Sequence, residues 1–237
     1  MDIVLVAGLW LDASAWDAVV GELEQRGHRA RPVTLPGQGD GRAGATLDDQ
    51  VAAVVAAVDA AVQSGGESGG GRPLVVGHSA ACSLAWLAAD ARVDQVAGTA
   101  LIGGWPSPDG EKYAAFFDLT DGVMPFPGWE PFEGPDSADL DDATKERVAA
   151  AAIPVPGEVA HGVVRLTDPR RYDVPTVLVC PEYTPAEAKE WIDAGDLPEL
   201  TQVTRLEMVD LDSGHWPMFS RPAELAQVLA EIADRLG

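Results

Sequence analysis

The serine at position 79 stands in a pattern that is typical of a nucleophile. It lies in the five residues GHSAA at 77–81, after the apolar run LVV at 74–76 and before an apolar, helix-like stretch. A sharp turn from strand to helix lifts a serine hydroxyl above the edge of a sheet. The turn needs small residues two positions away on each side, and Gly77 and Ala81 meet that need. The pattern predicts that Ser79 is a nucleophile; a serine that only caps a helix is the structural alternative.

His215 is the candidate base for this serine. It lies in SGHWP at 213–217, between the last predicted strand and the last predicted helix. In a loop at the carboxyl end of a strand, an imidazole that titrates near neutrality can take the hydroxyl proton. The other three histidines are placed less well. His28 lies in a helix-to-strand turn, His78 is expected to pack or to bind backbone, and His161 is expected to be a surface or substrate-facing residue of the stretch 105–173.

Two backbone turns could bind an oxyanion beside Ser79. The N–H of Ala80 would lie at a helix N-terminus, where partial positive charge favours an anion. A second donor is expected from Leu9 or Trp10 after the first strand, where Gly8 lets the chain turn closely. Trp216, next to the base, is expected to flank the substrate.

Short apolar runs alternate with amphipathic stretches, which predicts parallel strands and helices. Strands are expected at 3–7, 29–35, 74–76, 96–102, 176–180 and 205–211. Helices are expected from a Ser14 cap with Asp17 in a capping box, from Thr46 with Asp49, from the Ser79 turn to about Ala89, over 185–194, and after a Ser220 cap. Ser64–Gly71, almost all glycine and serine, is predicted to be a flexible surface connection.

The alternation breaks between residues 105 and 173, a stretch rich in proline and phenylalanine. Two helices are expected within it, over 111–119 and 141–152. The fold class predicted is therefore α/β, with a mostly parallel, doubly wound sheet and a small inserted cap. Residues 1–104 and 174–237 would form the core, and 105–173 the cap.

The net charge of −22 over 237 residues excludes some partners. Such a field repels phosphate backbones and anionic membrane surfaces, so neither nucleic acid nor a membrane is expected. No apolar run reaches the length of a membrane span or resembles a signal peptide, which predicts a cytoplasmic protein. No histidine or cysteine spacing suits a metal, and no glycine-rich loop suits a dinucleotide, so no cofactor is expected. The partner expected is a small-molecule substrate, and the protein a monomer or homodimer.

Five stretches together give the chain a resemblance to the α/β-hydrolase superfamily: VAGLWLDASAW, GHRARPVTLPGQGD, LVVGHSAAC, PTVLVC and SGHWPMFSRPAELA. Compact members such as plant methylesterases and hydroxynitrile lyases have a similar opening and size. The chain departs from them at Ala7, where a histidine is usual, at Ala81, where a glycine is usual, and at the acid that orients the catalytic histidine.

In the family that the chain resembles, the acid that orients the catalytic histidine usually follows the strand that corresponds to 176–180. Its usual position corresponds to Thr184. Glu182 is the nearest carboxylate and the best candidate. Asp109 is the candidate if the acid stands one strand earlier, and a Ser79–His215 dyad is the third possibility. Glu187 and Asp193 are expected to be solvated, and Asp212 stands too close to His215 in the chain to orient it.

These residues predict a serine-dependent carboxylic ester hydrolase acting on a small or medium uncharged ester. Its catalytic residues would be Ser79, His215 and Glu182. The alternatives are a lyase or cyclisation catalyst, or a non-catalytic ligand-binding protein, on the same fold. A hydroxynitrile lyase is disfavoured, because Trp216 rather than a lysine follows His215. Aromatic residues of 105–173 would suit an apolar group, although most of them are expected to pack that segment onto the sheet.

Overall fold

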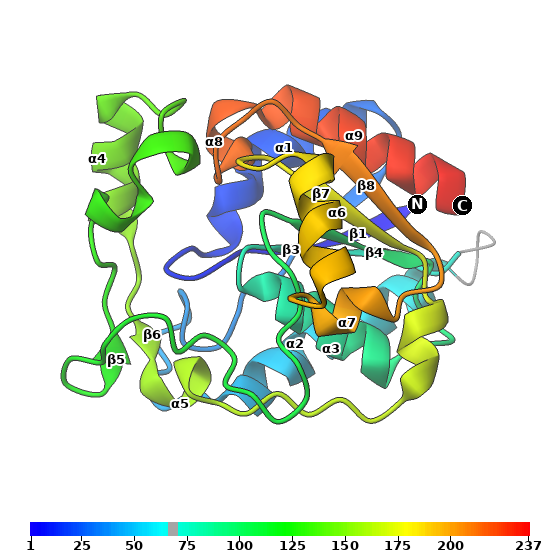
Figure 1. The fold of residues 1–237 in the computed structure, drawn as a ribbon, viewed down its shortest axis with the longest axis horizontal. Helices are drawn as coiled ribbons and strands as arrows, with labels where there is room; N and C mark the ends of the chain where they lie inside the picture. The colour runs from blue at the N-terminus through cyan, green and yellow to red at the C-terminus, as the bar shows by residue number, and fades with distance from the viewer. Residues whose placement is uncertain (66–70) are drawn as a thin grey trace.

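The centre of the molecule is a six-stranded sheet in which every pairing is parallel. The computed structural model describes residues 1–65 and 71–237 (Figure 1). The strand order is β2-β1-β3-β4-β7-β8. The strands are β1 (Asp2–Val6), β2 (Arg29–Pro32), β3 (Leu74–His78), β4 (Gly98–Ile102), β7 (Thr176–Cys180) and β8 (Leu206–Asp210). The predicted parallel α/β architecture is confirmed, with strands shorter than expected at 29–35 and 96–102.

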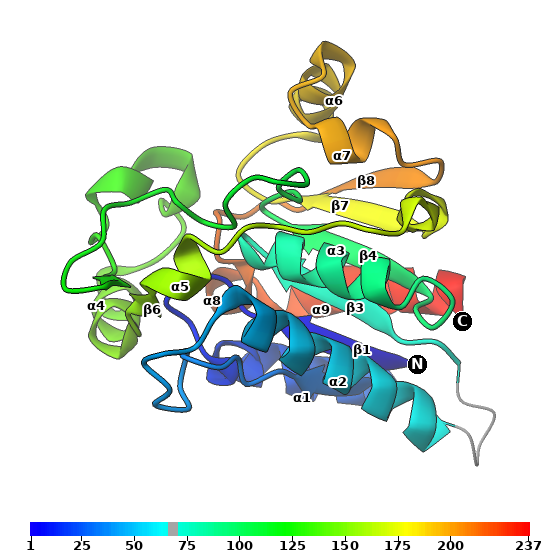
Figure 2. The same ribbon diagram turned by 90° about the horizontal axis from the view of Figure 1, so that it is seen from below.

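Helices cover both faces of the sheet, as Figures 1 and 2 show. They are α1 (Asp17–Gln25), α2 (Leu47–Gly65), α3 (Ala81–Ala91), α6 (Pro185–Ala194), α7 (Pro198–Thr201), α8 (Pro217–Ser220) and α9 (Pro222–Leu236). The strands are buried on both sides: Val4 and Val6 belong to the core with α2 and α3, whereas Ile3 and Leu5 belong to the core with α1 and α9. Burial on both faces explains why these strands read as continuous apolar runs.

Residues 105–173, the inserted segment, lie between β4 and β7 in the chain and beside the central sheet in space (Figure 1). The segment contains the antiparallel pair β5 (Val123–Met124) and β6 (Val155–Pro156), the helices α4 (Asp142–Ala151) and α5 (Gly157–Ala160), and the 3₁₀ turns η2 (Glu130–Phe132), η3 (Gly134–Asp136) and η4 (Pro169–Asp173). Helix α4 matches the helix predicted over 141–152. The division into core and cap stays a prediction.

The helix predicted over 111–119 is wrong. Tyr113 and Ala114 donate backbone hydrogen bonds to the carbonyls of Gly162 and Ala160, and Val164 donates to Glu111. Residues 111–114 are therefore paired with 160–164, a stretch about fifty positions further along the chain. This long-range pairing outweighs the local helical pattern of 111–119.

Two of the predicted helix caps are also wrong. Asp12, not Ser14, caps the first turn, a 3₁₀ helix η1 (Ala13–Trp16) that precedes α1, and its carboxylate accepts the N–H of Ser14. Ser220 is the last residue of α8, and α9 begins after Arg221 without a side-chain cap. The capping box of Thr46 and Asp49 is confirmed by reciprocal hydrogen bonds.

The prediction of a flexible connection over Ser64–Gly71 falls mainly on residues 66–70, which lie outside the described residues; Ser64 and Gly65 belong to α2.

Both cysteines, Cys82 and Cys180, are buried free thiols. Within residues 1–65 and 71–237, no helix combines the length and apolar character that crossing a membrane requires.

A buried ion network fastens the end of the inserted segment to the core. Arg171 in η4 donates to Glu199 of α7 (Nε–Oε2, 3.0 Å) and to Asp90 of α3 (Nη1–Oδ1, 3.3 Å), and all three side chains are less than a tenth exposed. The indole of Trp86 donates to the same Glu199 oxygen. The guanidinium therefore neutralises charge at two carboxylates that are shielded from water.

Arg171→Ala is expected to lower the free energy of unfolding by about 3–5 kcal/mol, because it strands two buried carboxylates without a counter-ion. The measurement is urea denaturation at neutral pH. The matched control is Arg170→Ala, which removes ion pairs to Asp168 and Asp94 from an arginine that is 59% exposed; exposed pairs contribute about 1 kcal/mol or less. Equal losses in the two variants would contradict the assignment of the network as a buried anchor.

Candidate active site

Four turns meet at the carboxyl edge of the sheet. Ser79 follows β3, Glu182 follows β7, His215 follows β8, and Leu9 with Trp10 follows β1. Parallel strands end at the same edge, and this is where open α/β sheets bind their ligands. The topology thereby gathers residues that lie as much as 206 positions apart in the sequence.

The Ser79 turn has the strained geometry expected of a nucleophile turn. Ser79 has φ = 56°, in the left-handed region that residues other than glycine seldom adopt. Its N–H is held by the carbonyl of Ile102 at the end of β4 (2.8 Å). A β-carbon at Gly77 would collide with the carbonyl oxygen of Ala81, so the strand and helix do pass as closely as the sequence pattern requires. Ser79 is half-buried.

His215 and Glu182 form the shortest polar contact described at the site. Nδ1 of His215 lies 2.6 Å from Oε1 of Glu182, and both side chains are about one-seventh exposed. A carboxylate can only accept, so Nδ1 carries the hydrogen and Nε2 carries the free lone pair. The tautomer is therefore the one that a base needs to take a proton from a hydroxyl. Among the described residues, the Ser79 hydroxyl makes no hydrogen bond to this ring, a contact that in free enzymes often tightens only with substrate.

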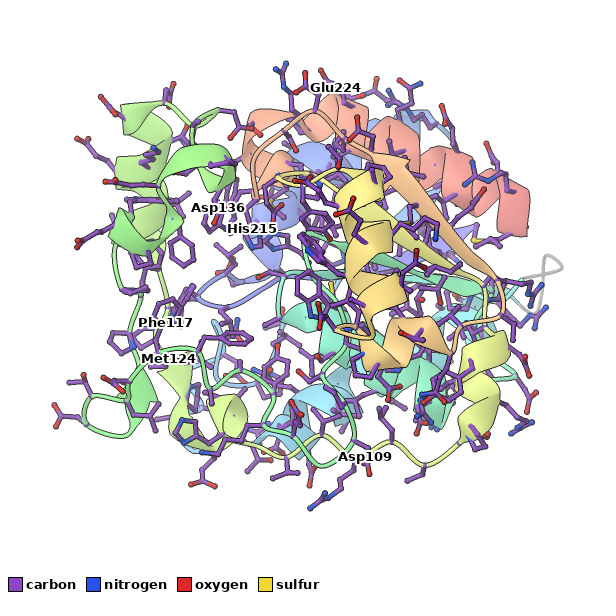
Figure 3. All side chains as sticks on the ribbon, viewed as in Figure 1. Asp109, Phe117, Met124, Asp136, His215 and Glu224 are labelled. Carbon is purple, nitrogen blue, oxygen red and sulfur yellow. The ribbon has the colours of Figure 1, made fainter. Side chains whose placement is uncertain are left out.

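The other candidate acids lie away from the His215 ring. Asp109 is exposed and its carboxylate accepts the N–H of Leu166; Figure 3 shows it on another side of the molecule from His215. Thr184, at the position where relatives usually carry the acid, caps α6 in a capping box with Glu187. Of the three alternatives for the acid, the geometry favours Glu182.

His78 holds the main chain of the base. Its Nε2 lies 2.7 Å from the carbonyl oxygen of His215, so Nε2–H is the donor, and its Nδ1 is buried without a partner in the described structure. The side chain is only 1% exposed. Burial, with a smaller effect from His215, lowers the pKa of His78 to about 3. His78 is thus a neutral donor, and the prediction that it packs or binds backbone is confirmed.

Backbone donors are available on both sides of Ser79. Ala80 stands at the start of α3, which has no side-chain cap. Within the part of the chain that the structure describes, the N–H groups of Ala80, Leu9 and Trp10 have no protein acceptor. Trp10 has φ = 63°, which shows a sharp turn after β1. These donors fit the predicted oxyanion role, which stays a prediction.

The indole rings of Trp10 and Trp216 pack the inserted segment onto the core. Trp10 lies within 6.0 Å of the ring centres of Phe117, Phe126 and Phe132, and its indole N–H donates to the carbonyl of Met124. Trp216 packs edge-on against Phe132 and is only 4% exposed. The two rings therefore serve as packing anchors, and a contact between Trp216 and substrate stays a prediction.

The sequence analysis missed two residues beside the base. The N–H of His215 donates to the carbonyl of Asp136 (2.7 Å), and the N–H of Gly214 donates to the carboxylate of Asp139 (2.7 Å). Figure 3 shows Asp136 next to His215. Burial raises the pKa of Asp136, against the opposing effect of His215. No local pattern marks these aspartates, because their partners lie more than seventy positions away.

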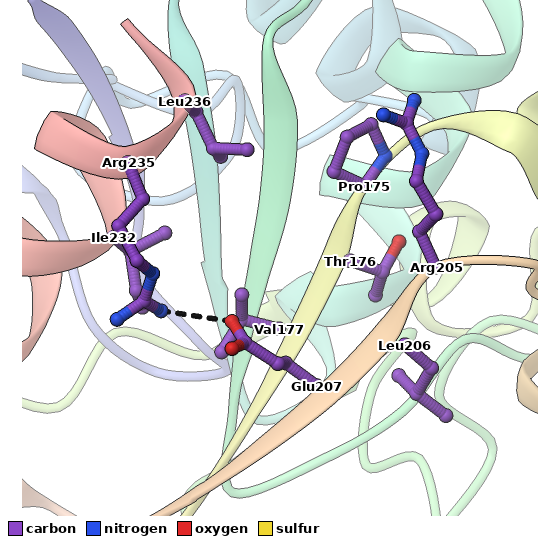
Figure 4. Close-up of a pocket in the computed structure, with 9 residues that line it drawn as sticks. All are labelled: Pro175, Thr176, Val177, Arg205, Leu206, Glu207, Ile232, Arg235 and Leu236. Atoms are coloured by element: carbon purple, nitrogen blue, oxygen red, sulfur yellow. Dashed lines mark hydrogen bonds and ion pairs between the residues drawn. The ribbon is translucent and has the colours of Figure 1, made fainter.

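The pocket in Figure 4 lies at the opposite edge of the sheet. It is lined by the first residues of β7 and β8, among them Thr176 and Leu206, and by the end of α9, with a volume of about 200 Å³. An ion pair between Arg235 and Glu207 stands at its side (2.8 Å). Because Ser79 and His215 follow the carboxyl ends of their strands, this pocket is not part of the candidate active site.

The parallel sheet, the strained serine turn and the late histidine define an α/β hydrolase. The model of the alpha/beta hydrolase family matches residues 3–228, so the chain belongs to this family, and the resemblance found in the sequence is confirmed. Among curated proteins, no sequence matches the chain significantly.

Solved structures of the same fold include several enzymes. An extracellular α/β-hydrolase from a Paenibacillus species, described as sharing structural and functional homology with tobacco salicylic acid binding protein 2, is 15% identical over 98% of both chains (TM-score 0.77). A pyrethroid hydrolase from Sphingobium faniae is 22% identical over 99% of this chain and 97% of its own (TM-score 0.68). Tomato methylketone synthase I, complexed with 2-tridecanone, is 17% identical over 100% and 98% (TM-score 0.72). Identities this low show a shared fold.

Proposed function

We propose that the protein is a serine hydrolase that cleaves a small or medium-sized uncharged carboxylic ester through an acyl-enzyme on Ser79. The observation that carries the proposal is the 2.6 Å contact between Nδ1 of His215 and Glu182, which fixes the base in its productive tautomer. The strained turn at Ser79, at the same edge of the sheet, supplies the nucleophile.

The reaction would proceed in two acyl transfers. The Ser79 hydroxyl oxygen attacks the ester carbonyl carbon as its proton passes to Nε2 of His215. The N–H groups of Ala80 and of Leu9 or Trp10 stabilise the oxyanion. Collapse of the intermediate breaks the bond to the alcohol, which leaves with the proton from His215. Water then attacks the acyl carbon as its proton passes to Nε2 of His215. Collapse breaks the bond to the Ser79 oxygen, which takes that proton back from His215, and the carboxylic acid is released.

The charge around the site disfavours an anionic substrate. Glu182 and Asp136 both lie near His215, and the chain carries a net charge of −22. A substrate with a negative charge next to its ester would meet this field on approach. One protein of the same fold is named a pyrethroid hydrolase, which supports hydrolysis as the class of reaction proposed here.

A fluorophosphonate probe tests the proposal directly, because it reacts with an activated serine. We expect a single adduct, mapped by peptide mass spectrometry to Ser79, and a burst of p-nitrophenol from p-nitrophenyl acetate. Ser79→Ala is the control and should show neither. Absence of both signals in the wild type would instead favour a lyase, a cyclisation catalyst or a binding protein on this fold.

A further inference from the structure

Residues 134–140 of the inserted segment, the clamp segment, bind the loop that carries His215. This loop, residues 211–216 between β8 and α8, is called the base loop. Two consecutive N–H groups of that loop are bound: Gly214 donates to Oδ2 of Asp139, and His215 donates to the carbonyl of Asp136, each at 2.7 Å. Both acceptors come from one short stretch: Asp136 is the last residue of η3, and Asp139 lies in the turn between η3 and α4. The base loop is therefore fixed to a part of the chain that contributes no strand to the central sheet.

The clamp leaves no room for a side chain at position 214. A β-carbon on Gly214 would collide with the carbonyl oxygen of Asp136 and with Oδ1 of Asp139. The Gly214 backbone thus packs directly against the Asp136 backbone and the Asp139 carboxylate. Because the groups are closely packed, a small displacement of the clamp segment should displace the base loop as well.

The clamp segment is itself well ordered by local bonds. Ala138 donates to the carbonyl of Gly134 and Leu140 to that of Ser137, and both Ser137 and Leu140 are buried. Leu140 belongs to the core with α1 and α9. The backbone that carries Asp136 and Asp139 is therefore held by its own hydrogen bonds and by Leu140 in the core, although the Asp139 side chain is exposed.

The remaining groups of His215 are held from elsewhere. Its carbonyl accepts from His78, which precedes the nucleophile, and its Nδ1–H donates to Glu182. Its N–H is the main-chain group left to the clamp segment. The position of His215 is then set by three parts of the chain, one of which is the inserted segment.

From this geometry we infer that Asp139 is a positioning residue: its carboxylate fixes the base loop so that His215 reaches the Ser79 hydroxyl, although Asp139 touches neither the ring nor the reacting atoms. The inference rests on the proposed hydrolase function, which it deepens by making the chemical step depend on the inserted segment. Asp139 should consequently affect kcat and not KM.

The test compares three variants with an uncharged p-nitrophenyl ester. Asp139→Ala removes the acceptor and should lower kcat by about 10- to 100-fold, the scale of a small misplacement of a catalytic group, with KM within about 2-fold. Asp139→Asn keeps a carbonyl acceptor and should return kcat to within about 3-fold of wild type. Asp141→Ala is the matched control, because it removes a carboxylate of the inserted segment, next to the clamp segment, that binds the N–H of Thr144 and not the base loop; its kcat should stay within about 2-fold.

Amide hydrogen exchange gives a readout that does not need turnover. In Asp139→Ala the Gly214 N–H loses its acceptor and should exchange at least about 10-fold faster, whereas in Asp139→Asn it should stay protected. Unchanged Gly214 exchange in Asp139→Ala, or equal loss of kcat in the Asp139→Ala and Asp141→Ala variants, would overturn the inference. If wild type shows no labelling and no turnover, the proposed function fails, and the exchange result alone decides whether the clamp exists.

Discussion

Glu182→Gln is expected to lower kcat for ester hydrolysis by about 10³-fold or more, the scale on which neutralising the acid of a serine triad acts. The amide keeps the size of the side chain but removes the negative charge that stabilises the imidazolium. It can also present its NH₂ group to Nδ1 and so favour the wrong tautomer. The measurement is steady-state kinetics with p-nitrophenyl acetate, with KM expected to change little because Glu182 does not bind the ester.

Two controls make the Glu182 experiment specific. Glu187→Gln changes a carboxylate five positions on, whose structural partner is Thr184 at the start of α6, and should keep kcat within about 2-fold. Asp109→Asn tests the alternative acid, which the structure places against Leu166, and should also be near wild type. Wild-type activity in Glu182→Gln would show that Ser79 and His215 work as a dyad.

Local signals were enough to predict most of the sheet and several helix ends. The capping box of Thr46 and Asp49 and the bounds of α6 follow from neighbouring residues, and the structure has both. The Ser79 turn could be read because its requirement for small residues at 77 and 81 is local too. Such features need no knowledge of distant contacts.

The failures occurred where distant partners decide the outcome. Residues 111–114 carry a helical pattern but pair with 160–164. The predicted Ser14 cap failed for a local reason instead, because a 3₁₀ turn capped by Asp12 begins earlier in the chain. Among the candidate acids, the sequence could favour Glu182 but not separate it from Asp109 or from a dyad, since that choice depends on which loop bends toward His215. Asp139 could not be found at all, because it meets Gly214 across 75 positions.

The wild type is expected to lose stability in acid because of His78. The unfolded histidine titrates near 6.5, whereas burial lowers the folded pKa to about 3. Below pH 6.5 the unfolded state therefore binds a proton that the folded state excludes, so stability falls as pH falls toward 3. Above pH 6.5 the histidine is neutral in both states and its contribution is constant. One such group changes the free energy of unfolding by about 1.4 kcal/mol per pH unit once the unfolded form is fully protonated.

His78→Gln isolates this effect, because glutamine keeps an N–H donor for the carbonyl of His215 but does not titrate. We expect the free energy of unfolding of wild type, measured by urea denaturation relative to His78→Gln, to fall by about 2 kcal/mol between pH 6.5 and pH 4.5. Between pH 7.5 and pH 9 the two proteins should run parallel, which serves as the internal control. Other titrating groups, including His28, are common to both and cancel in the difference. A constant difference across the acid range would mean that His78 accepts a proton in the folded protein, and that its bond to the base loop is made by a charged donor.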